Sequence, residues 1–460
     1  MAKQAKKDKK LMGIQQNLLS VDSETKAIIT YLCEQSNSLY NCGTYWARQI
    51  LFKTDRIVSK FDVIYECGKN IHSVALPSTP AQQTLLSVSE AFKSFRELRG
   101  KFLRGELDFR PKAPKYRVSG GLFKVAYPNT GAQRPKLSSD GKTLTFSMGN
   151  QVNRWFSVKS FDLPMPENLD YSKVKEFTIL PKNGAFYLEA SYEVEKKAHT
   201  LNADEALGID LGTASNLMAC VDTMGNSFLV DSKQAKAMNQ LYNKRIAQRK
   251  KAQCCRGKLP PANMRGKSVD YWDIVCDAIT RKRNNQMRDM VNKAAKLVVD
   301  YCTSKGLGTL VVGWNQGIKD ECNMGRRENQ KFVQMPLAKL KTRISQLCEQ
   351  HGIRFVETEE ANTSAASYLD GDSLPQHGQK PSDWKASGKR SPRGLYTTAN
   401  QCKVNADLNG AANILSKVAG NLGIDLSRLG RRCLTTVGRI RLWGTPKFNA
   451  CPKESQRLQP

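Results

Sequence analysis

The sequence predicts an α+β protein of several domains, in which a barrel-like module of strands is interrupted by helices and followed by an α/β half. Three observations predict this. Long helical patterns occupy residues 22–51 and 78–98. Residues 122–194 alternate apolar and polar positions in the manner of half-buried strands. After residue 206, short apolar strands are followed by long helical stretches, which is typical of an α/β domain.

In the N-terminal half, two dipeptides predict hairpin turns, Asp140-Gly141 and Asn183-Gly184. A further strand at residues 11–19 is expected to complete the strand module. We therefore expect the strand module to comprise residues 1–21 and 109–200, with a helical insert at 22–108.

In the C-terminal half, the pattern alternates strands with helices. The predicted strands are 206–212, 216–221, 227–230, 309–312 and 353–357, and the predicted helices are roughly 232–253, 268–305, 336–350 and 406–418. We expect one domain from residues 201–361 and 402–425, an insert at 362–401, and a basic C-terminal tail at 426–460.

The composition points to a polyanionic partner. The 72 Lys and Arg against 42 Asp and Glu leave a formal charge of +30, and the excess is spread along the chain. No apolar run reaches the roughly 20 residues of a membrane span. The 13 cysteines are scattered without a CxxC pair, and the Lys-rich N-terminus does not resemble a signal peptide, so we expect a prokaryotic cytoplasmic protein, at the nucleoid when bound to DNA.

Two carboxylates stand in unusual surroundings. Asp210 interrupts the apolar strand ALGIDLG, where an unpaired buried carboxylate would be costly. Asp407 begins the helix in NADLNGAANIL, whose small residues allow the helix to approach a sheet. A strand-end turn and a helix N-terminus would explain each aspartate separately. Together they predict one site on a ribonuclease-H-type fold.

These segments resemble the RuvC-type nuclease domain of the TnpB family, which is related to the Fanzor proteins and type V CRISPR effectors. The similarity rests on GIDLG at 208–212, the stretch RNNQMRDMVNKAAKLVVDYC from Arg283, and NADLNGAANI at 405–414. It implies a wedge β-barrel, a helical recognition insert and a RuvC-like nuclease domain. It also implies an RNA-guided endonuclease that recognises a short flanking motif and cuts DNA with one RuvC-type site.

The third carboxylate expected from this resemblance is displaced. The family usually carries a Glu at the end of the strand where this chain has Gly313. By similarity to relatives with a relocated Glu three residues before a Thr-Ser pair, Thr363-Ser364 indicates Glu360, with Glu359 and Glu357 as alternatives. The implied cofactor is a pair of Mg²⁺ ions, or Mn²⁺, held by Asp210, Glu360 and Asp407.

The family's four-cysteine zinc ribbon is not expected here. Ser367 and Asp370 stand where the first cysteine pair would fall, and Cys402 is isolated. A structural zinc site needs four ligands, so no structural zinc is predicted. The insert keeps several cations that could contact nucleic acid.

The expected partners are a guide RNA and double-stranded DNA, bound by a monomer; a transposon-end RNA and a CRISPR RNA both fit as the guide. Short polar groups on the first two helices could read the flanking motif, and a Pro-rich basic segment at 109–117 could follow the phosphate backbone or be a plain linker. The predicted nucleic-acid contacts are Asn41, Tyr45, Ser78, Thr79, Gln82, Gln83, Lys112, Lys115, Arg117, Arg245, Arg249, Arg390 and Arg393. The alternatives are a nuclease-inactive, guide-dependent DNA-binding regulator and a guide-free resolvase or transposase.

Overall fold

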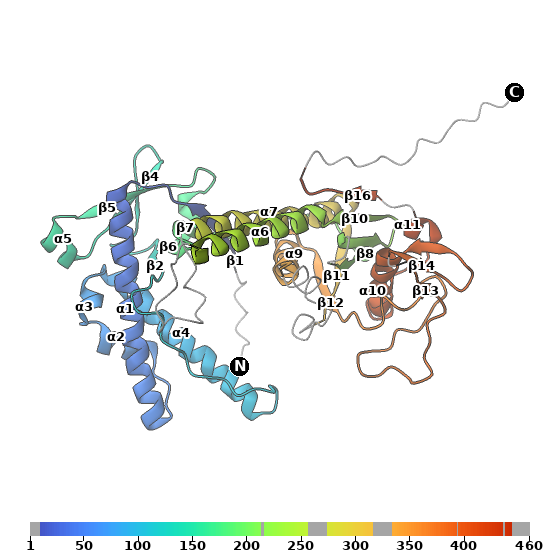
Figure 1. Ribbon diagram of the computed structural model, residues 1–460, viewed down its shortest axis with the longest axis horizontal. Coiled ribbons are helices and arrows are strands. Elements are labelled where there is room, and N and C mark those ends of the chain that lie inside the picture. The colour runs from blue at the N-terminus through green and yellow to red at the C-terminus, as the bar shows by residue number, and fades with distance from the viewer. Residues whose placement is uncertain are drawn as a thin grey trace, which may run out of the picture. The chain divides into compact units, whose positions relative to one another are not determined.

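The computed structural model divides the chain into two compact units, the first ending at Val194 and the second beginning at Glu195 (Figure 1). The structure describes residues 10–212, 216–255, 274–315, 334–392, 394–435 and 438–443. Within these ranges, none of the helices has the length and apolar character needed to cross a membrane.

Two long helices organise the first unit. Helix α1 (Ser23–Thr54) begins after Asp22, whose carboxylate accepts a hydrogen bond from the backbone N–H of Thr25 at 2.8 Å. Helix α4 (Ser78–Leu103) follows Pro77 and packs against α1, where Gly43 leaves room for the side chains of Leu85 and Val88. The shorter helices α2 (Lys60–Cys67) and α3 (Ile71–Val74) connect them. Both predicted long helices are confirmed, each a few residues longer than expected.

The strands of the first unit form two sheets, of order β1-β7-β6-β2 and β3-β4-β5. Their bounds are β1 (Leu11–Leu18), β2 (Val125–Pro128), β3 (Lys136–Leu137), β4 (Thr143–Ser147), β5 (Ser160–Pro164), β6 (Val174–Lys182) and β7 (Ala185–Val194), with the short helices α5 (Asn150–Phe156) and η1 (Tyr171–Lys173) between them. The predicted N-terminal strand is confirmed, since β1 pairs with β7 along its whole length.

Both hairpin predictions are also confirmed. Asn183 and Gly184 connect β6 to β7 with positive φ angles of 49° and 64°, and Gly141 turns the chain before β4 with φ 72°. The two sheets share one aromatic core, in which Phe146 of β4 contacts Phe177 of β6 at a centroid distance of 6.3 Å. This shared core makes the strands a single barrel-like module.

The second unit is built on a six-stranded sheet of order β12-β11-β8-β9-β10-β16. Its strands are β8 (Asn202–Leu211), β9 (Asn216–Asp222), β10 (Ser227–Asp231), β11 (Leu307–Gly313), β12 (Arg354–Thr358) and β16 (Gly438–Ile440). Strands β8, β9 and β10 are antiparallel neighbours, whereas β11 and β12 run parallel to β8. This order and these directions are those of a ribonuclease-H-like core.

Helices cover both faces of this sheet. Helices α7 (Ile274–Lys305) and α9 (Leu337–His351) share a core with Leu207 and Ile209 of β8. The alternate residue Ala206 belongs instead to the core under helix α10 (Ala406–Leu422). Because side chains alternate along a strand, Asp210 lies on the α10 face with Ala206. Helix α6 (Lys233–Cys255) packs against α7 through the 2.8 Å bond from Arg283 to Asn239.

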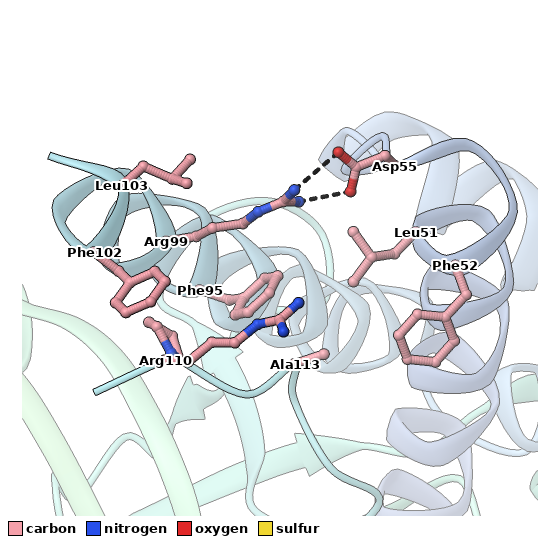
Figure 2. Close-up of a pocket in the computed structure, with 10 residues that line it drawn as sticks. Leu51, Phe52, Asp55, Phe95, Arg99, Phe102, Leu103, Arg110 and Ala113 are labelled. Carbon is pink, nitrogen blue, oxygen red and sulfur yellow. Dashed lines mark hydrogen bonds and ion pairs between the residues drawn. The ribbon is translucent and has the colours of Figure 1, made fainter. Parts of the chain in front are cut away.

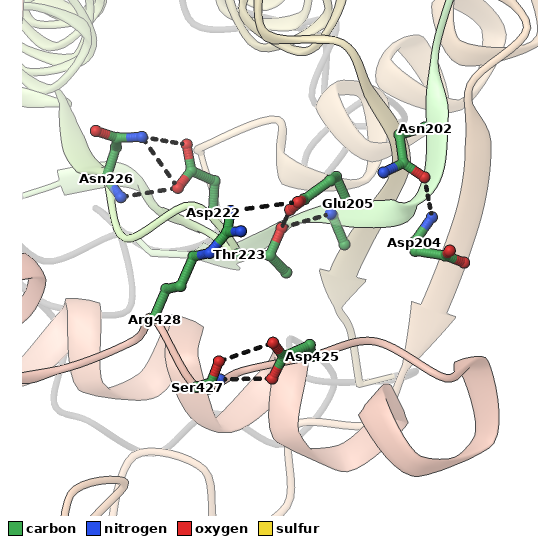
Figure 3. A network of polar contacts seen from close by, with 10 residues as sticks. Asn202, Asp204, Glu205, Asp222, Thr223, Asn226, Asp425, Ser427 and Arg428 are labelled. Atoms are coloured by element: carbon green, nitrogen blue, oxygen red, sulfur yellow. Dashed lines mark hydrogen bonds and ion pairs between the residues drawn. The ribbon is translucent and has the colours of Figure 1, made fainter.

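The predicted basic tail is wrong for its first part. Residues 426–435 and 438–443 fold into the second unit, with helix α11 (Arg431–Thr435), buried Leu429 and Leu434, and β16 added beside β10. Arg428 lies 3.6 Å from Glu205 of β8 (Figure 3). The many Lys and Arg residues of this segment led to the prediction of a tail, because they outnumber its few apolar residues. Residues 444–460 lie outside the described ranges.

Candidate active site

Asp210 lies on β8 against the first turns of α10. A Cβ atom added at Gly410 would stand 2.7 Å from Oδ2 of Asp210, so any other residue there would require this carboxylate to shift. Gly208, two residues earlier on the same face, is equally restricted, because an added Cβ would meet Leu415 at 2.4 Å. The small residues noted in the sequence therefore bring α10 onto the aspartate-bearing strand.

Asp407 stands at the start of α10. The side chain of Asn405 caps the helix and accepts hydrogen bonds from the backbone N–H groups of Asp407 and Leu408 at 3.0 and 3.1 Å. Both carboxylate oxygens of Asp407 are engaged. Nδ2 of Asn216 donates to Oδ2 at 2.8 Å, and Nη2 of Arg390 lies 2.6 Å from Oδ1. The predicted phosphate contact Arg390 thus pairs with a predicted metal ligand.

Glu360 follows β12, and its side chain lies beside Gly313 at the end of β11. A Cβ atom added at Gly313 would stand 2.5 Å from Cδ1 of Ile414, 2.7 Å from Cγ of Glu360 and 3.0 Å from Oε1 of Glu360. The side chain of Asn315 fixes the backbone of Glu360, because its Oδ1 accepts a hydrogen bond from the backbone N–H of Glu360 at 3.0 Å. Glu360 therefore reaches the space that a side chain from position 313 would enter.

The alternative glutamates have other partners. Glu359 pairs with Lys417 at 2.7 Å and accepts the backbone N–H of His377, while Glu357 pairs with Lys341 at 2.6 Å. Both carboxylates are already matched by a lysine. Of the three glutamates, these contacts favour Glu360 as the partner of Asp210.

Electrostatics connect the three carboxylates. Burial, together with the Asp407 carboxylate, raises the pKa of Asp210 to about 7, although Arg390 opposes the rise. Burial and the neighbouring Asp210 raise the pKa of Glu360 to about 8. Carboxyl groups with raised pKa values lack sufficient positive charge around them. Perturbed acids of this kind are typical of functional sites.

The donor set fits a hard divalent cation. Carboxylate oxygens are the ligands that Mg²⁺ prefers, and a cation would offset the burial of charge and the carboxylate repulsion that raise the pKa values of Asp210 and Glu360. The buried Oδ1 of Asn216 has no hydrogen-bond partner and adds an unsatisfied oxygen beside Asp407. Within the described ranges, no three His, Cys, Asp or Glu side chains gather closely enough to hold a metal ion. Oδ1 of Asp407 is instead paired with Arg390 at 2.6 Å.

The insert carries a small sheet of β13 (Lys389–Arg390), β14 (Leu395–Thr397) and β15 (Lys403–Asn405). Ser367 and Asp370, which stand where the first cysteine pair of the TnpB zinc ribbon would fall, take part in hydrogen bonds within the insert. Asp372 accepts the backbone N–H of Ser367 at 2.7 Å, and Asp370 accepts that of Ala399 at 2.9 Å. Cys402 is a free, half-buried thiol. That this insert works without structural zinc stays a prediction.

The predicted nucleic-acid residues of the first unit fall into two groups. Asn41 exchanges two hydrogen bonds with the backbone of Arg117, at 2.8 and 3.1 Å, and so holds the 109–117 segment against α1. The guanidinium of Arg117 is committed as well, donating to Asn37 and packing over Phe123. Asn41 and Arg117 therefore hold the first unit together through contacts within the protein.

The remaining candidates in the first unit lie nearer solvent. Tyr45, Gln82, Lys112 and Lys115 are exposed, and Gln83 is half-buried. Ser78 and Thr79 bind Oε1 of Gln133 at 3.1 and 2.8 Å, a contact that the sequence did not suggest.

In the second unit, Arg245 is exposed on α6, and Arg249 is half-buried on the same helix. Arg393 lies outside the described residues. Sequence reasoning missed two asparagines of the site, Asn216 and Asn315. The first closes the run ALGIDLGTASN, and the second follows Gly313 by two residues, so proximity to the motifs was the available signal.

Comparison with known proteins shows what fold the chain shares. No family model matches it, and no curated protein matches it either. The chain resembles a solved structure described as a Cas12f1–sgRNA–target DNA complex, with TM-score 0.55, 14% identity and coverage of 85% of this chain and 83% of that one. A mini-RNA-guided endonuclease, CRISPR-Cas_phi3, aligns over 89% and 92% of the two chains at 10% identity, but its TM-score of 0.44 adds no support. The protein thus has a multidomain α+β fold similar to that of the Cas12f1 chain over most of its length.

Proposed function

We propose that this chain is an RNA-guided DNA endonuclease of the TnpB type, with Asp210, Glu360 and Asp407 as the ligands of two Mg²⁺ ions. The position of Glu360 beside Gly313 carries the proposal. A chain that had simply lost its second carboxylate would not need another carboxylate in the same space. The fold shared with a Cas12f1 chain, whose structure holds a single guide RNA and target DNA, supports RNA and DNA as partners.

The protein's own residues account for much of the site's chemistry. When bound, Mg²⁺ would lower the pKa of a coordinated water and neutralise charge on the phosphodiester. Asp210 and Glu360 bind a cation only as carboxylates, so loss of their protons accompanies cation binding. Asn216 holds Asp407 in place through its amide N–H. Arg390, once released from Asp407, can donate two parallel hydrogen bonds to a phosphate.

Target choice is assigned to base pairing with the guide, whereas the protein reads a short duplex motif. Tyr45, Gln82 and Gln83 on α1 and α4 are the exposed or half-buried groups best placed for that reading. The surplus of +30 supplies the positive field for the nucleic-acid backbones.

A second candidate function is a guide-dependent DNA-binding regulator without nuclease activity. One observation favours it, namely that Arg390 already neutralises Asp407 at 2.6 Å. In this reading the guanidinium permanently occupies the place of the cation, and the fold retains only binding.

The deciding experiment uses the full chain with its guide RNA, a matching DNA duplex and Mg²⁺. Asp210→Ala should abolish cutting while leaving RNA and DNA binding intact. The matched control is Asp204→Asn, an exposed carboxylate on the same strand, which should cut like the wild type. Target binding by the wild type without cutting, in Mg²⁺ or Mn²⁺, would establish the regulator instead. Purification without any discrete RNA, combined with cutting that needs none, would point to the guide-free resolvase or transposase.

A further inference from the structure

A cavity of about 590 Å³ opens in the first unit, between the C-terminal ends of α1 and α4 (Figure 2). Its third wall is the start of the extended segment 109–117. The volume falls within the range of roughly 300–1,000 Å³ typical of small-ligand sites. No carboxylate or metal site of the second unit is involved, so the cavity needs its own explanation.

The walls are aromatic. Phe95 and Phe102 of α4 line one side, and Leu51 and Phe52 of α1 line the other (Figure 2). Phe52 is 62% exposed, so its ring is accessible from solvent. Its ring is nevertheless held in position, because the guanidinium of Arg48 lies 4.8 Å from its centroid.

Arg48 is itself held by two further contacts with the 109–117 segment. It lies 5.3 Å from the ring of Tyr116 and donates to the carbonyl of Pro114 at 2.7 Å. The 109–117 segment thus holds the arginine that positions Phe52. An exposed aromatic ring in a fixed orientation is a stacking surface that loses little entropy on binding.

Two cations line the cavity, and they differ in their partners. Arg99 makes a two-pronged ion pair with Asp55, at 2.6 and 2.9 Å. Arg110 has no hydrogen-bond or ion-pair partner within the described part of the chain, and its side chain extends into the cavity below Arg99 (Figure 2). The cavity therefore combines flat apolar faces with one uncompensated positive charge.

A nucleotide matches this combination, since its base offers a π-face and its phosphate a negative charge. We propose that this cavity binds an unstacked nucleotide of RNA, with the base against Phe52 and the phosphate on Arg110. RNA is the better source, because its loops and bulges already present splayed bases, whereas a DNA duplex must first be unstacked. This inference rests on the proposed RNA partner but not on nuclease activity.

The test uses the full chain and a short single-stranded RNA that carries one 4-thiouridine. After irradiation, crosslinked peptides are identified by mass spectrometry. The wild type should crosslink in the peptides that contain Phe52 or Phe102. Phe52→Ser and Arg110→Gln should each reduce that crosslink by at least about fivefold, the loss expected when one stacked base is released.

Matched controls lie outside the cavity on the same helical region. Phe61→Ser removes another phenylalanine that is 70% exposed, and Arg96→Gln removes an exposed arginine of α4. Both should crosslink like the wild type. Circular dichroism of all four variants checks that they are folded.

Unchanged crosslinks in the cavity variants would overturn the proposal, and so would equal labelling by the same sequence as DNA. Dimerisation that Phe52→Ser abolishes would overturn it too, since a second copy would then fill the cavity. The nuclease proposal fails separately, if Asp210→Ala cuts like the wild type. A crosslink at Phe52 in a chain that never cuts DNA leaves the cavity assignment standing.

Discussion

The two units carry opposite kinds of site. In the second unit, Asp210 of β8, Asp407 of α10 and Glu360 after β12 form an acidic centre, and burial, with a smaller contribution from the neighbouring carboxylate, raises the pKa values of Asp210 and Glu360. In the first unit, aromatic rings and a free guanidinium line a cavity built from helix ends and an extended segment. The acidic centre suits a cation and the cavity suits an anion with a flat face. The difference shows that the overall charge of +30 does not describe either site.

The acidic centre is tested most strongly by comparing adjacent glutamates. Glu360→Gln should lower the rate of guided cutting by at least about a hundredfold, because a ligand for charge stabilisation is lost. Glu359→Gln, which removes a carboxylate already paired with Lys417, should change it less than about threefold. Single-turnover cutting at saturating Mg²⁺ measures both. Equal losses in the two variants would show that position 360 has no special role.

A second prediction moves the carboxylate back to β11. Gly313→Glu alone should cut poorly, since its Cβ would stand 2.7 Å from Cγ of Glu360. Gly313→Glu combined with Glu360→Gly should cut about tenfold faster than Glu360→Gly alone, because one carboxylate again enters the shared space once the terminal methyl of Ile414, 2.5 Å from the added Cβ, moves aside. The same single-turnover assay compares the variants. A double variant no better than Glu360→Gly would mean that β11 cannot deliver a ligand.

The third prediction concerns the guanidinium at the acidic centre. Arg390→Gln removes the cation 2.6 Å from Asp407, so Mg²⁺ should half-saturate the protein at a concentration severalfold lower. Thermal unfolding across a Mg²⁺ titration measures this, with Lys389→Gln as the exposed neighbouring control. If the half-saturating concentration rises instead, Arg390 does not compete with the metal.

The smallest expected effect is a change of the melting temperature with pH, measured in EDTA. The folded pKa values of about 7 for Asp210 and about 8 for Glu360 exceed their ordinary values near 4. Between about pH 4 and 8, the folded chain therefore keeps protons on these two carboxyl groups that the unfolded chain has lost. The free energy of unfolding is thus highest at low pH and falls as the pH rises through this range. The melting temperature should fall by a few degrees from pH 5.5 to 8.5. Asp210→Asn should flatten this slope, and an unchanged slope would contradict the raised pKa values.

Much of the second unit could be predicted from local patterns. The strand carrying Asp210, the helix beginning at Asp407 and the strand ending at Gly313 were predicted within a few residues. Each of these elements is a short apolar segment with clear boundaries. The segment after Leu426 was misassigned, because cations outnumber its few buried apolar residues.

By itself, the sequence predicted the strands and helices of the second unit and singled out Asp210 and Asp407, whereas the expectation of a third carboxylate came from the resemblance to the TnpB family. The resemblance indicated Glu360 through its spacing from the Thr363-Ser364 pair and left Glu359 and Glu357 as alternatives. The tertiary structure added the partners of these glutamates, since Glu359 pairs with Lys417 whereas Glu360 lies beside Gly313. The Arg390–Asp407 ion pair and the aromatic cavity were also visible only in the tertiary structure. The first joins β13 to α10, 17 residues further along the chain, and the second joins α1 to α4 and the 109–117 segment. Such contacts depend on how packed elements meet, and no periodicity within one segment encodes them.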